Sequence, residues 1–105
     1  MGYEFDAERT RFAIKDALDM VITEPDRVSA LATRLLRDLV YLVNTDRLRM
    51  CEDKAVTAEV ERATAFVSGH AQPRPGEHPH DHLQKLAYET RCMAVSYQLL
   101  TRDER

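Results

Sequence analysis

The clearest pattern in this chain is in its last long segment, from about residue 82 to residue 101, where apolar positions form two separate stripes. A helix turns by about 100° per residue, which fixes the members of each stripe. The first consists of Leu83, Leu86, Ala87, Thr90, Met93, Ala94, Tyr97 and Leu100. The second lies roughly opposite and consists of Tyr88, Cys92, Val95 and Leu99. One stripe is enough to cover a core, so the second predicts a further contact.

The remaining segments also show helical spacing of apolar residues. It predicts helices over about residues 6–22, 25–43, 57–68 and 82–101, with a short helical piece over about 47–53. Asp6 and Thr57 are expected to be N-caps, and Gly69 is expected to follow the third long helix. Residues 70–80 contain three of the four prolines and predict a loop. Short connections elsewhere favour antiparallel neighbours, so we expect an all-α, four-helix bundle with a longer loop before the last helix.

The helix predicted over 25–43 is apolar over about half of its circumference, which makes it the expected central element. Leu35 and Leu39 should be core residues at its centre. Phe5, just before the helix predicted over 6–22, and Phe12 within it lie a heptad apart, on the side opposite to the expected core and among acidic residues. This is a second sign of apolar surface beyond the core.

Together these residues predict an interface on the first and last helices. Its expected members are Phe5, Phe12, Tyr88, Cys92, Val95 and Leu99. The alternative is that both helices are central, or that the loop and the 47–53 segment cover these side chains.

Composition then narrows the class of protein. The 105 residues are 44% hydrophobic and 31% charged, which predicts one folded domain over residues 1–105. A net charge of -3 argues against a general nucleic-acid binder or a basic membrane-surface protein. No apolar run reaches the roughly 20 residues of a transmembrane helix, and residues 1–12 lack the apolar region of a signal peptide. We therefore expect a cytoplasmic protein in which Cys51 and Cys92 are thiols.

Two side-chain clusters offer alternatives. His78, His80 and His82, with Glu77 or Asp81, could hold a metal ion if the segment is extended. We favour a solvated loop in which Asp81 caps the last helix, because a metal site needs an organised surrounding shell. The second cluster could bind RNA or phosphate, but acidic residues lie between its members, which favours a solvated face. It consists of Arg34, Arg37, Arg47 and Arg49.

No catalytic signature is present in the sequence. It lacks the Glu-x-x-His repeat of helical di-iron sites, a Cys-x-x-Cys pair and a glycine-rich phosphate loop. The sequence therefore predicts a protein that is not an enzyme and needs no cofactor. We expect a small helical interaction module, a self-associating adaptor or an accessory subunit, whose partner is a second copy or another protein. The alternatives are a subunit of a nucleic-acid complex, which would use the arginine cluster, and a metal-binding protein, which would use the histidines.

Overall fold

The structure, a computed structural model, describes residues 5–18 and 25–102. Five helices make up most of these residues, and no strand occurs among them: α1 (Ala7–Leu18), α2 (Pro25–Val43), α3 (Asp46–Arg49), α4 (Lys54–His70) and α5 (Pro79–Arg102). The predicted all-α class is therefore confirmed. Helix α2 coincides with the range that its apolar spacing predicts, whereas α3 is shorter than the predicted 47–53 piece. The predicted end of the first helix, at about residue 22, lies outside the described residues.

Capping explains where the structure departs from the predicted boundaries. The Asp6 carboxylate accepts hydrogen bonds from the N–H groups of Glu8 (3.0 Å) and Arg9 (3.1 Å), so Asp6 caps α1 as expected. Helix α4 begins earlier than predicted because Asp53, rather than Thr57, is its N-cap and accepts from the Ala55 N–H at 2.8 Å.

The two ends of the predicted loop also differ from expectation. Helix α4 continues through Gly69 to His70, so this glycine does not end it. Helix α5 begins at Pro79, and the carbonyl of His78 accepts the first bond of the helix from the His82 N–H. Asp81 therefore lies inside the first turn of α5, and its prediction as the cap of that helix is wrong.

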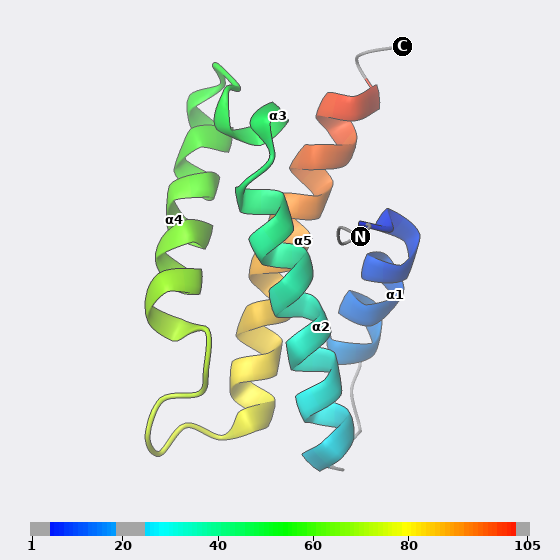
Figure 1. Cartoon of the computed structure of the whole chain (residues 1–105), viewed down its shortest axis with the longest axis vertical. Helices are drawn as coiled ribbons and strands as arrows, with labels where there is room; N and C mark the ends of the chain where they lie inside the picture. The colour runs from blue at the N-terminus through cyan, green and yellow to red at the C-terminus, as the bar shows by residue number, and fades with distance from the viewer. Residues whose placement is uncertain (1–4, 19–24, 103–105) are drawn as a thin grey trace.

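Helices α2 and α5 form the centre of the molecule (Figure 1). Helix α1 packs on one side of this pair and α4 on the other, and within the described residues α1 and α4 do not touch. Helices α1 and α2, α2 and α4, and α4 and α5 run antiparallel to each other. This arrangement is compatible with the predicted four-helix bundle. Because α1 and α4 stay apart, the side of α5 that faces away from α2 has a helix on each flank, and no described helix lies over it.

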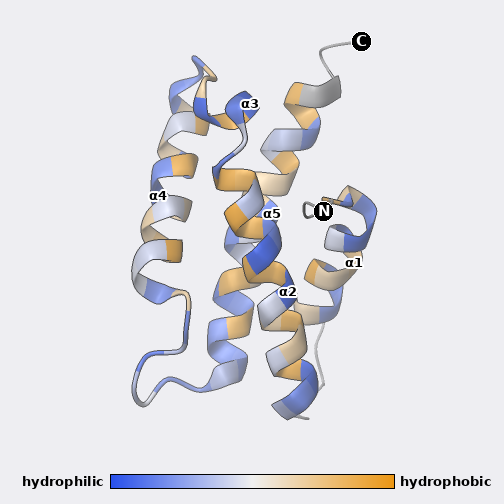
Figure 2. Cartoon of the chain, viewed as in Figure 1, coloured by the Kyte–Doolittle hydropathy of each residue, from blue (hydrophilic) through white to orange (hydrophobic). Residues whose placement is uncertain are grey.

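The core lies between these helices, where the apolar residues of α2 and α5 meet (Figure 2). Leu35 and Leu39 are completely buried, as predicted, and the first stripe of α5 packs against them. The fully buried members of that stripe are Leu83, Leu86, Ala87, Thr90 and Met93. The Thr90 hydroxyl donates to the Leu86 carbonyl at 2.8 Å, so its burial leaves no unsatisfied donor.

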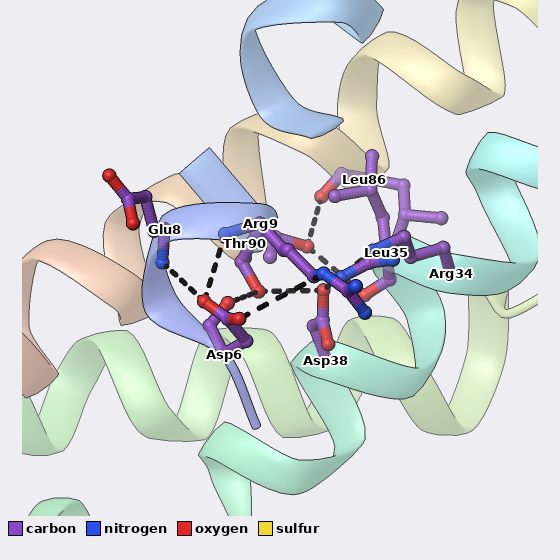
Figure 3. A network of polar contacts seen from close by, with 9 residues as sticks. Asp6, Glu8, Arg9, Arg34, Leu35, Asp38, Leu86 and Thr90 are labelled. Carbon is purple, nitrogen blue, oxygen red and sulfur yellow. Dashed lines mark hydrogen bonds and ion pairs between the residues drawn. The ribbon is translucent and has the colours of Figure 1, made fainter. Parts of the chain in front are cut away.

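One carboxylate is buried in this core. Asp38 of α2 has no exposed surface, and its Oδ2 accepts a hydrogen bond of 2.8 Å from the Thr10 hydroxyl of α1 (Figure 3). Arg34 lies one turn earlier on α2, with its Nε 3.9 Å from the same oxygen. The other oxygen, Oδ1, has no hydrogen-bond partner among the described residues. Burial disfavours the ionised form and raises the Asp38 pKa from 3.8 to about 6.

We expect Leu39→Ala to lower the free energy of unfolding by about 2–5 kcal/mol, because it leaves a cavity where α2 meets the core. Urea denaturation followed by circular dichroism measures the change. The neighbouring Val40 is 39% exposed, so Val40→Ala is the matched control and should cost less than about 0.5 kcal/mol. A loss below about 0.5 kcal/mol for Leu39→Ala would contradict its place at the centre of the core.

The burial of Asp38 makes the stability of the protein depend on pH. The folded state keeps the Asp38 proton up to about pH 6, whereas the unfolded chain releases it near pH 3.8. This group therefore makes stability fall as the pH rises from about 4 to 6, with the full loss present above pH 6. Asp38→Asn keeps an oxygen for the Thr10 bond and removes the charge. We expect it to raise the free energy of unfolding at pH 7 by on the order of 3 kcal/mol and to leave it nearly unchanged at pH 4.

Thermal denaturation of the natural protein and of the Asp38→Asn variant between pH 4 and pH 8 tests this expectation. Asp16→Asn removes an exposed carboxylate from α1 and is the control for a general charge effect. A less stable Asp38→Asn variant at pH 7 would mean that the attraction between Asp38 and Arg34 exceeds the cost of burying the carboxylate.

Candidate functional site

The outer face of α5 carries the predicted second stripe. Tyr88, Val95 and Leu99 are 54%, 49% and 54% exposed, and Cys92 is partly buried between them. These four residues are called the α5 seam below. They lie opposite the fully buried stripe of the same helix, on the side that no described helix covers. Apolar side chains that share one open helix face are a feature of protein interaction surfaces.

Polar pairs between α4 and α5 border one side of the α5 seam. Arg62 donates to Glu89 at 3.3 Å, and its guanidinium lies 6.0 Å from the centre of the Tyr88 ring. Further along, the Ser96 hydroxyl donates to Glu59 at 2.7 Å. The negative charge of the Glu89 carboxylate raises the pKa of the Arg62 guanidinium beside it, so this side chain stays charged. These contacts fix α4 against α5 and leave the apolar seam beside a polar edge.

The two phenylalanines predicted for this interface behave differently. Phe5 stacks on Tyr41 with 5.1 Å between ring centres and meets the Tyr97 ring edge-on at 5.5 Å. Phe5 is therefore partly buried and packs against the core through aromatic rings of α2 and α5, and its place in an interface stays a prediction. Phe12 is 59% exposed. It points away from the buried side of α1, so it is a separate apolar side chain rather than a member of the α5 seam.

The histidine cluster is divided between the interior and the surface. His82 is only 2% exposed, and its Nε2 lies 2.8 Å from the carbonyl oxygen of His70. The His70 and His82 rings meet edge-on at 5.0 Å, and Phe66 packs against both. In contrast, His78 is exposed, and its Nδ1 accepts the backbone N–H of His80 at 3.1 Å. His82 thus joins the start of α5 to the end of α4, the two helices that the loop connects.

Glu77 is the centre of a polar clamp that the sequence does not predict. Its Oε1 lies 2.6 Å from the His70 Nε2 and 3.2 Å from the Arg74 N–H, and its Oε2 lies 2.8 Å from the Lys85 Nζ. The hydrogen bonds from Lys85 and then from His70 lower the Glu77 pKa from 4.5 to about 2. Gly76, with φ of 83°, allows the turn that brings Glu77 back to these partners.

Some of the predicted metal ligands are already engaged in these hydrogen bonds. Glu77 and His82 are engaged in other bonds, and His78 and His80 lie with 6.4 Å between ring centres. Within residues 5–18 and 25–102, no three side chains of His, Cys, Asp or Glu are placed to hold a metal ion. Metal binding by His78, His80, His82, Glu77 and Asp81 stays a prediction that would require another arrangement of this loop.

The arginine cluster does not form one strip. Arg34 lies beside the buried Asp38, and Arg49 is exposed on α3. Arg37 and Arg47 do line one open hollow of about 590 Å³, whose wall includes Tyr41 and other residues at the end of α2 and the start of α3. Asp38, which the sequence suggests as a surface acid between the arginines, is instead buried. Nucleic-acid binding through these four arginines stays a prediction.

The described residues also bear on the predictions about membrane crossing and about the two cysteines. None of the helices among them has the length and apolar character that a membrane crossing requires. Cys51 and Cys92 are both free thiols, as the sequence predicts.

The Glu77 clamp leads to a prediction about acid stability. Because the folded state lowers the Glu77 pKa, its contribution is complete above about pH 4.5 and is lost as the pH falls towards 2. Glu77→Gln should therefore have a lower melting temperature than the natural protein at pH 7, and the difference should shrink between pH 4.5 and pH 2. Melting curves across this range measure it, with Glu61→Gln, an exposed acid of α4, as the control. Equal melting temperatures at pH 7 would contradict a stabilising clamp.

Comparison with known proteins does not assign this chain to a family. No protein-family model matches the chain, and neither the curated proteins nor the solved structures contain a significant match.

Proposed function

We propose that the chain is a four-helix bundle that acts as a non-enzymatic interaction module and pairs with a second copy of itself through the α5 seam. The observation that carries this proposal is the half-exposed apolar stripe of α5, which the flanking helices leave open. Each large apolar side chain gains about 1.5–3 kcal/mol when it leaves water. Tyr88, Val95 and Leu99, three such residues that are half-exposed on each copy, provide a driving force for association, part of which offsets the entropy lost on binding.

The spacing of the α5 seam suits a helix as its partner. Tyr88, Cys92, Val95 and Leu99 are separated by four, three and four residues, which is the alternation of a two-stranded coiled coil. A second α5 helix can place its own apolar residues between these. This pairing needs no opening of the core, because all four residues lie on the side of α5 opposite to the buried stripe.

The charges along α5 disfavour a parallel pair of α5 helices, so we propose the antiparallel orientation. In a parallel pair, Lys85 would face the partner's Lys85, and Asp81 would face the partner's Asp81. In an antiparallel pair centred between Cys92 and Val95, Cys92 faces the partner's Val95. Arg91 then lies beside the partner's Gln98, and Lys85 comes opposite the partner's Arg102 only at the two ends of the pair, outside the four seam residues. A dimer with two-fold symmetry is also the commonest homo-oligomer.

The proposal is tested by placing two charges in the α5 seam. We expect Val95→Glu combined with Leu99→Glu to raise the dissociation constant of the dimer by at least about 100-fold, because docking would bury unpaired carboxylates. Analytical ultracentrifugation gives the mass, and circular dichroism gives the helix content. Val40→Glu combined with Met50→Glu is the matched control, since it adds the same charge at exposed apolar positions outside α5.

The expected result is a dimeric natural protein, a dimeric control and a helical monomer for the seam variant. A natural protein that is monomeric at high concentration would contradict the second copy as partner. An unfolded seam variant would indicate that the four residues stabilise the single chain.

A further inference from the structure

A second hollow lies on a different part of the molecule, between the first half of α2 and the start of α5. Its volume is about 1000 Å³, at the upper end of the range of small-molecule sites. One wall consists of α2 residues, and the other consists of the loop after α4 and the first turn of α5. Small side chains at Ser29 and Ala32 keep the space open, because they fill little of the volume between the two walls.

The loop wall of this cavity is held in place by contacts already described. The Glu77 clamp joins the loop to α4 and α5, and His82, which itself lines the cavity, is tied to the His70 carbonyl. Pro73 and Pro79 restrict the backbone of the same wall. A cavity with fixed walls loses little freedom when a ligand enters, and this preorganisation favours binding.

The cavity is mainly aliphatic. Val28, Ala32 and Leu36 line it from α2, and the prolines add further apolar surface from the loop side. Such a surface fits an alkyl chain, since every methylene group that leaves water gains about 0.8 kcal/mol. Where the start of α5 forms the wall, the lining becomes polar and includes His78, His80 and Asp81.

The polar end favours an uncharged head group. The Nδ1 of His78 accepts the His80 N–H, so the proton of the neutral His78 ring is on Nε2, which can donate. Among the described lining residues, Asp81 alone is acidic, and it lies in the first turn of α5, where its charge offsets the positive end of the helix. No lysine or arginine is among the described lining residues. An anionic head group would therefore have no cationic side chain to pair with among these residues. A cationic head group would meet the partly positive N-terminus of α5 and the His78 N–H, which both repel it.

We propose that this cavity binds an uncharged amphipathic molecule, whose alkyl chain lies along Val28, Ala32 and Leu36 and whose hydroxyl or carbonyl head accepts a hydrogen bond from His78. The proposal is independent of the α5 seam, which lies on the opposite side of α5 from the buried stripe. It assigns a ligand site to the His78–His82 segment that requires no metal ion.

The test compares three probes with the same chain and different heads: octan-1-ol, octanoate and octylamine. Binding to the full chain is measured at pH 7.5 by titration in ¹H–¹⁵N correlation spectra. We expect saturable binding of octan-1-ol with shifts at residues 28–36 and 78–82, and affinity at least tenfold lower for both charged probes. Ala32→Phe should fill the cavity and reduce the octan-1-ol affinity at least tenfold, whereas Ala58→Phe, at an exposed position of α4, should not change it.

Two further variants keep the test decisive if Ala32→Phe does not fold. Ser29→Phe fills the same cavity from an exposed position of α2, and it should reduce octan-1-ol affinity to a similar extent. His78→Asn keeps a side chain that can cap α5 but removes the Nε2 donor, and it should weaken octan-1-ol binding about fivefold. Non-saturable binding, equal affinity for the three probes, or affinities unchanged by the cavity-filling variants would each overturn the proposal.

Discussion

The packing of α2 against α5 is the constraint on which the rest of the structure depends. These two helices contain most of the fully buried leucines, and each of the other helices packs against both of them. Since the described parts of α1 and α4 take opposite sides of this pair and do not touch, the described helices cover α5 on three sides only. The open fourth side is the α5 seam. The surface that we propose for self-association is thus a consequence of how a short chain surrounds its central pair.

The polar residues of the interior are satisfied to different degrees, and this difference separates structural from responsive groups. Thr90 and His82 each bond to a nearby carbonyl, and Glu77 accepts several donors. Asp38 has a hydroxyl on one oxygen and no bond on the other. A buried carboxylate with this few partners binds its proton more tightly, which brings its titration close to neutral pH. The stability of the contact between α1 and α2 therefore varies with pH as Asp38 titrates near pH 6.

Sequence pattern predicts those features that depend on one helix at a time. The range of α2, the burial of Leu39 and the two stripes of α5 follow directly from helical spacing, and Pro25 marks the start of α2. Competing caps limit the boundaries, because Asp53 and Thr57 are both good N-cap residues and only the folded loop decides between them. Contacts between distant segments have no local signal. Phe5 is covered by Tyr41 and Tyr97, and Glu77 meets Lys85 and His70, only because the bundle brings these residues together.

The contact between Phe5 and Tyr97 has a consequence for the order of folding. These rings lie near opposite ends of the sequence, and α1 packs on both α2 and α5. Closing so long a loop costs more entropy than joining α4 to α5 through their short connection, so local helix pairs can form earlier. During synthesis, α1 has only part of its binding surface until α5 has emerged. The packing of α1 is therefore complete only after α5 has been made, although α1 is made before the other four described helices.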